Sequence, residues 1–424
     1  MTMRLEFESR LLVVFASLVA ACGNPGASAS DAGAVPPGDR FTLSVVGGYG
    51  SGTYPAGATV HVWSAASTTG EVVLPWTGDA ALLAEPMEWH TTFVMPARDV
   101  ALTSNREALA VTLNVETFEG STDRPKNVRY YFPPRMRGVV LFSHGTGGSS
   151  TFIESHEAFA LALALVRAGY GVMGTEAEEA VAGDLNGDGR ERWLASPRAL
   201  RADNVDLRNL EILLANFESR GLLPAGTPLF ALGMSAGGSF SHFLGTVSAS
   251  AVAGDFPRLR FEAVVSYCAD ATAAQSGTNS NTPSAWFMCG EEDNPEVSNV
   301  EARANSRAME DRGIPTDYVE HPPSPLYDER FSRIRGISVE TSRAMAAELR
   351  AAGFVGTDGF LNTDGDAIGA FVIANPGMFP TILAQSGELG AIRSQLKVMR
   401  AEHAMYADYT QRNVGWFDRF NPTP

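Results

Sequence analysis

The sequence is poor in cysteine, in positive charge and in long hydrophobic runs. Only 3 of its 424 residues are cysteines, which excludes a small scaffold built on many disulfides. Its 32 lysines and arginines are outnumbered by 48 aspartates and glutamates, and the net charge of -16 would repel nucleic acid and anionic lipid headgroups. The apolar run at residues 11–21 is about half as long as a membrane-spanning helix. We therefore expect neither a nucleic-acid partner nor a spanning segment.

The composition is that of a globular protein, with 45% hydrophobic and 19% charged residues. Single hydrophobic cores stop growing at about 250–300 residues. A chain of 424 residues therefore has room for one large domain and a smaller one.

The N-terminus has the features of an export signal. Arg4 and Arg10 precede the apolar run, which ends in small residues. The segment Val19-Ala20-Ala21-Cys22 resembles the lipobox of bacterial lipoproteins, which implies a signal peptide over residues 1–22 and a diacylglyceryl group on Cys22. An ordinary secretory signal with a chance cysteine is the alternative. The resemblance places the protein in the bacterial cell envelope, in contact with a membrane through its lipid anchor only.

Two segments follow the leader. Residues 23–40 are rich in Gly, Ala, Ser and Pro and are expected to be a disordered linker. Residues 41–105 contain short β-rich runs separated by glycine-rich turns, which predicts a small all-β module. Its phrases at residues 47–52, 76–79 and 93–96 resemble divergent internalin-type B repeats of bacterial surface proteins. Such repeats are spacers or adhesive units, and the lone histidines His61 and His90 are not expected to be metal ligands.

From residue 107 to 424 apolar strands alternate with helical stretches, which predicts an α/β domain with a mostly parallel, doubly wound sheet. The predicted strands have continuously apolar interiors and occupy residues 128–134, 138–145, 170–177, 229–235, 261–269, 285–290 and 316–321. Residues 322–395 are expected to form a helical, lid-like insertion after the last strand, with one helix beginning after Ser338.

Ser235 is the predicted nucleophile. The run LFALG-Met234-Ser235-Ala236-Gly237-Gly238 places Gly-x-Ser-x-Gly between a strand and a helix, and this context defines the nucleophile elbow of α/β-hydrolases. Small neighbours allow the backbone to approach closely, and the helix start provides free N–H groups beside the serine. A second glycine-rich segment, residues 143–148, follows an earlier strand. The resemblance to the α/β-hydrolase superfamily implies that backbone N–H groups of Ala236 and Thr146 form the oxyanion hole.

In that superfamily an acid follows the nucleophile and a histidine follows the acid. Asp293 lies just past the apolar strand that ends at residue 290 and is the predicted acid, with Asp270, one strand earlier, as the alternative. Two histidines follow. His403 is favoured as the general base because a final amphipathic helix comes after it, and His321 is the alternative, although a stiff proline-rich exit follows it.

Two further features stay open. The phrase Asp184-Leu-Asn186-Gly-Asp188-Gly resembles the start of an EF-hand loop but lacks its final glutamate, so a calcium site is one interpretation and an acidic surface turn the other. Cys268 and Cys289 end predicted buried strands, and they are expected to be either a disulfide or two buried thiols.

The motifs together resemble those of secreted polyester depolymerases and feruloyl-type esterases of the α/β-hydrolase superfamily. The resemblance implies an exported serine hydrolase that cleaves small or polymeric carboxylic esters through an acyl-enzyme at Ser235, with no required cofactor. Two alternatives remain at this stage. One is a serine peptidase of the same fold, and the other is a surface adhesion lipoprotein whose hydrolase domain is an inert scaffold.

Overall fold

In the computed structural model of the chain, residues 39–68, 70–270, 281–290 and 299–422 are described. The predicted leader with Cys22, almost all of the predicted linker, and Asp293 lie outside these ranges. Residues Asp39–Pro424 form one compact unit. None of the helices within the described ranges is both long enough and apolar enough to cross a membrane.

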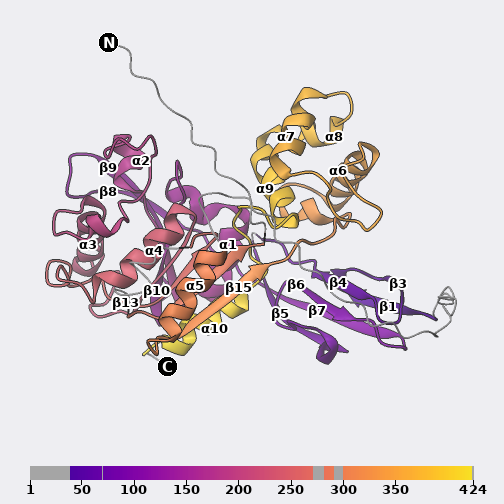
Figure 1. Ribbon diagram of the computed structural model, residues 1–424, viewed down its shortest axis with the longest axis horizontal. Helices are drawn as coiled ribbons and strands as arrows, with labels where there is room; N and C mark the ends of the chain where they lie inside the picture. Colours follow the sequence, from indigo (N-terminus) through magenta and orange to yellow (C-terminus); the bar gives the residue numbers. More distant parts are fainter. Residues whose placement is uncertain (1–38, 69, 271–280, 291–298, 423–424) are drawn as a thin grey trace, which may run out of the picture. The chain divides into compact units, whose positions relative to one another are not determined.

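A large mixed sheet of eight strands is the centre of the fold (Figure 1). Its order is β15-β14-β13-β12-β10-β11-β9-β8. The first six strands in this order pair in parallel. Strands β9 and β8 pair antiparallel and form one edge of the sheet. The strands are β8 (Asn114–Glu119), β9 (Pro125–Tyr131), β10 (Gly138–Ser143), β11 (Tyr170–Gly174), β12 (Leu229–Met234), β13 (Phe261–Tyr267), β14 (Ser284–Cys289) and β15 (Thr316–His321). The prediction of a mostly parallel α/β sheet is confirmed.

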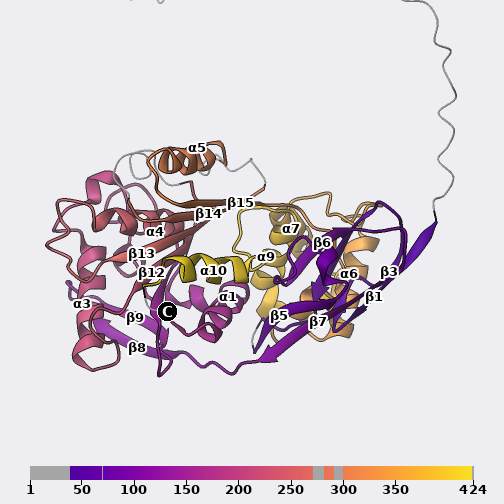
Figure 2. The same cartoon turned by 90° about the horizontal axis from the view of Figure 1, so that it is seen from below.

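Helices cover both faces of this sheet, which explains why its central strands are apolar throughout (Figure 2). Helices α1 (His156–Arg167) and α10 (Thr410–Phe420) share one core with the strands. On the opposite face lie α3 (Val205–Ser219), α4 (Ala236–Val247) and α5 (Asn299–Glu310). The strand β12 is held between two apolar layers, so its carboxyl end is placed rigidly.

Residues from Arg40 to Ala108 form strands and one short 3-10 helix, η1 (Ala80–Leu82). Strands pair in two small sheets of order β3-β1-β7-β5 and β2-β4-β6. The strands are β1 (Arg40–Val46), β2 (Gly48–Tyr49), β3 (Gly52–Pro55), β4 (Thr59–Ser64), β5 (Glu71–Gly78), β6 (His90–Val94) and β7 (Val100–Ala108). An aliphatic and aromatic core that includes Val62, Trp76 and Phe93 lies between them.

These strands are tied to later parts of the chain by buried polar and aromatic contacts. Glu88, just before β6, accepts hydrogen bonds from the backbone N–H groups of Gln411 (3.1 Å) and Arg412 (2.8 Å) in the first turn of α10. A carboxylate at this position satisfies free N–H groups and complements the helix dipole. The guanidinium of Arg333 lies 3.5 Å from the ring centroid of Trp89. The β-rich residues therefore support α10, the C-terminal helix that packs on the large sheet.

Between β15 and α10 the chain forms a helical cluster with its own apolar core. Its elements are η5 (Arg330–Arg333), α6 (Val339–Ala351), α7 (Gly365–Ala374), α8 (Pro380–Ala384), η6 (Ser386–Glu388) and α9 (Leu389–Met399). The helix expected after Ser338 is present, because the Ser338 hydroxyl accepts the backbone N–H of Thr341 and caps α6. Helix α9 continues past residue 395, the expected end of the insertion.

Candidate active site

Ser235 occupies a strained turn between β12 and α4. Its φ of 58° and ψ of -125° lie in a region that a residue with a side chain rarely adopts. The backbone N–H of Ser235 donates to the carbonyl of Tyr267 at the end of β13, 2.9 Å away, which fixes the turn against the neighbouring strand. Its side chain is half-buried at the carboxyl end of the parallel strands. This is the geometry of a nucleophile elbow.

The two glycines of the motif are required by close backbone contacts. A Cβ added to Gly233 would lie 2.2 Å from the carbonyl oxygen of Gly237, and one added to Gly237 would lie 2.0 Å from that of Ser143. Such distances leave no room for a side chain. The Gly-x-Ser-x-Gly spacing is therefore explained by the packing of β12, α4 and the end of β10.

The predicted oxyanion loop, residues 144–148, lies against the serine. A Cβ on Gly145 would come 3.3 Å from the Cβ of Ser235. The backbone N–H of Gly147 donates to the carbonyl of Glu191 (2.8 Å), which anchors the loop on its far side. Ala236 is the first residue of α4, so its N–H has no partner within the helix. The structure thus brings the segments of Ala236 and Thr146 together beside Ser235.

His144 shapes this loop through hydrogen bonds at both nitrogen atoms of its ring. Its Nε2 accepts the backbone N–H of Ala177 (3.1 Å), so in the neutral ring Nδ1 carries the proton and donates to the carbonyl of Gly145 (2.7 Å). Burial lowers the pKa of His144, which keeps the ring neutral. The indole of Trp193 donates to the His144 carbonyl (2.9 Å). The ring is held on both sides as a structural support.

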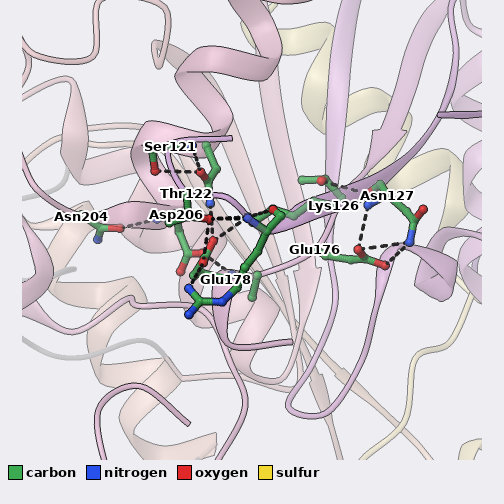
Figure 3. Close-up of polar contacts among 12 residues, drawn as sticks. Ser121, Thr122, Lys126, Asn127, Glu176, Glu178, Asn204 and Asp206 are labelled. Carbon is green, nitrogen blue, oxygen red and sulfur yellow. Dashed lines mark hydrogen bonds and ion pairs between the residues drawn. The ribbon is translucent and has the colours of Figure 1, made fainter. Parts of the chain in front are cut away.

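A buried charged cluster surrounds Glu178 (Figure 3), the first residue of α2 (Glu178–Ala182), which directly follows Ala177. Lys126 Nζ and Glu178 Oε2 are 2.6 Å apart, and both side chains are fully buried. Thr122 and Asn209 donate to the same carboxylate at 3.0 and 2.9 Å. Burial alone would raise the pKa of Glu178, but these hydrogen bonds and the Lys126 charge hold it below its ordinary value. The cluster fixes the segment that orients His144.

Replacing Lys126 with methionine is expected to remove about 3–5 kcal/mol of stability, because it leaves the Glu178 carboxylate buried without its cation. Arg124→Met is the matched control. Arg124 contacts the same carboxylate at 3.2 Å, but its side chain is 46% exposed, so its loss is expected to cost about 0–1 kcal/mol. Thermal and urea unfolding midpoints measure both. Equal destabilisation by the two variants would contradict the role given to the buried pair.

His403 lies in the loop between α9 and α10, close to the carboxyl ends of β13 and β14. One nitrogen of its ring and the sulfur atoms of Cys268 and Cys289 all lie within 4.8 Å of one another. The two cysteines are free buried thiols. Among the described residues no hydrogen bond joins Ser235 Oγ to His403, whose Nδ1 is buried without a partner, and the role of His403 as general base stays a prediction.

Backbone strain is concentrated around these residues. Among the described residues, the non-glycine residues with positive φ are Ser235 (58°), Cys268 (47°) and Ala401 (58°). Ala401 is two residues before His403, and its Cβ would lie 3.4 Å from a Cβ built on Gly290, next to Cys289. Such strain persists only where the surroundings impose it, and it gathers at functional sites. The three positions together mark the carboxyl ends of β12, β13 and β14 as the candidate site.

The loop that carries His403 is held by several buried contacts that sequence reasoning missed. The Tyr406 hydroxyl donates to the carbonyl of Met288 (3.0 Å), and the Ala407 N–H donates to Glu157 (3.0 Å). Asp408 Oδ1 contacts His90 Nδ1 at 2.9 Å, and His90 Nε2 in turn contacts His61 Nδ1 at 3.0 Å. These partners come from β4, β6, β14 and α1, so only the folded chain reveals them. His61 and His90 are thus packing residues that brace this loop.

The other predicted site residues have different positions. His321 is buried, its Nε2 contacts the carbonyl of Val398 (3.1 Å), and its ring stacks on Tyr406 with centroids 4.3 Å apart. Burial lowers the pKa of His321. Asp270 follows β13, and its backbone carbonyl accepts from Trp286 and Asn305 at 3.3 and 2.8 Å. Asp293 lies outside the described residues, so the choice between the two acids stays a prediction.

The candidate calcium loop is folded around its own carboxylates. Asp184 accepts the backbone N–H groups of Gly187 (2.7 Å) and Gly189 (2.7 Å), and the side chain of Asn186 accepts that of Asp188 (2.9 Å). These hydrogen bonds lower the pKa of Asp184. In the described part of the chain, these residues do not belong to a converging group of three or more His, Cys, Asp or Glu side chains. Calcium binding here stays a prediction.

Comparisons with known proteins give only weak structural resemblances. No model of a protein family matches the sequence, and no curated protein matches it. Esterase 2 of Thermogutta terrifontis shows 15% identity over 57% of this chain and 95% of its own, with a TM-score of 0.37. A lipase/esterase of Lactobacillus plantarum shows 14% identity over 57% and 99%, with a TM-score of 0.35. A serine hydrolase homologue of Coxiella burnetii shows 14% over 50% and 88%, with a TM-score of 0.32. The inference about function therefore rests on the geometry of the site.

Proposed function

We propose that this chain is a serine hydrolase of the α/β-hydrolase type that cleaves carboxylic esters through an acyl-enzyme on Ser235. The observation that carries the proposal is the strained elbow, with Ser235 at a φ of 58° between β12 and α4. A structural serine has no need of this conformation, which costs about 1–3 kcal/mol. The glycine loop beside it offers backbone donors, as acyl transfer requires.

In the proposed mechanism Ser235 Oγ attacks the ester carbonyl while His403 accepts the hydroxyl proton. The carbonyl oxygen becomes an oxyanion, which the N–H groups of Ala236 and Thr146 stabilise. His403 returns the proton to the leaving alcohol, and the acyl group stays on Ser235. A water molecule, deprotonated by His403, then attacks the acyl group, and His403 returns the proton to Ser235 Oγ as the bond to the serine breaks and the acid is released. Asp293 orients the imidazole and stabilises its charged form.

The assignment of His403 over His321 is supported by position. His403 lies in a loop at the ends of β13 and β14, next to the strand that leads to Ser235, and its side chain is half-buried. His321 is fully enclosed, with one nitrogen bound to a carbonyl and its ring stacked on Tyr406. A general base must reach both the nucleophile and the leaving group. An enclosed ring fits that role less well.

Labelling with a fluorophosphonate probe tests the proposed activity. The probe reacts with an activated serine, so the purified protein is expected to be labelled and Ser235→Ala is not. A folded wild-type protein that remains unlabelled would favour the alternative of a surface binding protein with an inert hydrolase scaffold. Short-chain, long-chain and feruloyl esters, with peptides as competitors, would then define the substrate and separate an esterase from a serine peptidase.

We further propose that the protein is exported and held at the bacterial cell envelope by lipid on Cys22. The proposal is supported by the lipobox-like segment, and the two acyl chains of a diacylglyceryl group would anchor the protein stably where a single chain would not. Cys22→Ser is expected to move the protein from the membrane fraction to the soluble fraction. Radiolabelled fatty acid incorporation measures the modification directly. Membrane retention of the variant would contradict a lipid anchor at this residue.

A further inference from the structure

The cluster of Cys268, Cys289 and His403 has a chemistry that ester hydrolysis does not use. Each residue offers one ligand atom, and the three atoms all lie within 4.8 Å of one another. Across the described ranges this is the only group of three or more His, Cys, Asp or Glu side chains that converges in this way. Two thiols and an imidazole are ligands that soft and borderline transition metals prefer, whereas calcium and magnesium prefer oxygen.

The three ligands are held by rigid elements. Cys289 ends β14, and Cys268 directly follows β13, its parallel neighbour. Cys268 has a φ of 47°, which turns its side chain out of the strand's regular alternation. The sulfur of Cys268 lies 3.4 Å from the carbonyl of Ala404, next to His403. The cysteines and the histidine are thus held near one another by protein contacts, without a metal.

Distances and burial fit a small tetrahedral site. Zinc binds thiolates at about 2.3 Å and imidazole nitrogen at about 2.1 Å, so its ligand atoms stand about 3.5–3.8 Å apart. Since the three ligand atoms lie within 4.8 Å of one another, metal binding requires each separation to shorten by at most about 1 Å. Both cysteines are buried, and His403 is half-buried. Its buried Nδ1 has no hydrogen-bond partner among the described residues. The cation would enter from the histidine side.

We propose that Cys268, Cys289 and His403 form a binding site for one Zn²⁺-class cation, with a fourth position left to water. The site needs no oxidant. Each thiol binds as a thiolate, so any proton it carries passes to the buffer, and the neutral imidazole donates one lone pair. Three protein ligands and an open position are a recognised zinc arrangement, with Cys₂His among its known forms.

Occupancy of the site has a consequence that rests on the proposed function. A nitrogen of His403 bound to a cation can no longer accept the proton of Ser235. Metal binding and ester hydrolysis therefore exclude each other, and Zn²⁺ becomes an inhibitor that competes with catalysis at the general base. Metal binding itself does not depend on the protein's being a hydrolase.

Cobalt and zinc titrations test the site. The full chain carrying Cys22→Ser, in which only two cysteines remain, is reduced and titrated without oxygen. Co²⁺ is expected to give thiolate-to-cobalt charge-transfer absorption that saturates at one ion per chain, and Zn²⁺ is expected to displace it. Cys268→Ser and Cys289→Ser should each weaken cobalt binding by at least about 100-fold. A smaller loss, of about 10- to 100-fold, is what removal of a residue that only supports a metal ligand would cause. His403→Gln should weaken cobalt binding as well.

His156→Gln is the matched control, because His156 is a partly exposed histidine of α1 whose ring lies 3.6 Å from Glu388. It should bind one cobalt with unchanged affinity. Absence of charge-transfer absorption in the reduced protein, or binding that survives both cysteine substitutions, overturns the site. One bound zinc in a protein without esterase activity would uphold the site and refute the proposed function. Esterase activity in a protein that binds no metal would do the reverse.

Discussion

Replacement of Ser235 with alanine is expected to lower kcat for ester hydrolysis by about 10⁶-fold, the loss seen when the nucleophile of a serine protease is removed. In the proposed mechanism the hydroxyl oxygen attacks the substrate, and no covalent intermediate forms without it. The fold is expected to remain, because the elbow is fixed by backbone contacts, such as the one from the Ser235 N–H to the Tyr267 carbonyl. Initial rates with a short-chain ester measure the effect.

Ser239→Ala is the matched control for that experiment. Ser239 lies one turn further along α4, where its N–H donates to the Ser235 carbonyl, and its side chain is also half-buried. The same kind of hydroxyl is removed at a position outside the Gly-x-Ser-x-Gly motif. Activity should stay within about twofold of the wild type, in line with the small effects of substitutions away from special sites. Turnover by Ser235→Ala would refute the mechanism.

Replacement of His403 with alanine is expected to lower kcat by about 10⁴-fold or more, since residues of a triad act as a unit and loss of the base leaves only binding and the oxyanion hole. KM should change little, because in the proposed mechanism the imidazole acts on the proton of Ser235 and not on substrate binding. A fall in kcat with little change in KM distinguishes loss of the general base from loss of folded structure. Steady-state kinetics over a range of ester concentrations measure it.

Two further histidine variants serve as a control and as a test of the alternative general base. His156→Ala changes a partly exposed histidine of α1 that lies 3.6 Å from Glu388, and it should keep normal kinetics. His321→Gln keeps a polar side chain in the enclosed position and should keep most of the activity if the protein folds. Near-normal kcat in His403→Ala, together with loss of kcat in a folded His321→Gln, would transfer the role of base to His321.

The sheet could be predicted because its central strands are continuously apolar. Strands β10, β12 and β14 are buried almost throughout, and their bounds fall within a few residues of the apolar runs. Strand β8 was missed because only Phe118 among its residues is buried. An edge strand with mostly exposed side chains leaves no such signal. The antiparallel pairing of β8 and β9 likewise depends on chain topology and not on local pattern.

The elbow and the glycine loop could be predicted because each is a local feature. Ser235 sits between a strand and a helix, and the clashes that require Gly233 and Gly237 involve segments already expected to be neighbours. The surroundings of His403 could not be predicted. Cys268 and Cys289 were expected at strand ends, but their approach to His403 depends on the path of a loop 114 to 135 residues further along the chain. The support that His90 gives to Asp408 spans a longer separation still.

Trapping of the acyl-enzyme tests the central claim most directly. The protein is mixed with a chromogenic ester, quenched in acid during turnover, and digested for mass spectrometry. We predict a pre-steady-state burst of released alcohol and an acyl mass increment on the peptide that contains Ser235, with neither in Ser235→Ala. Rapid ester hydrolysis without an acylated Ser235 in the wild type, or an acyl group on a different residue, would contradict the account.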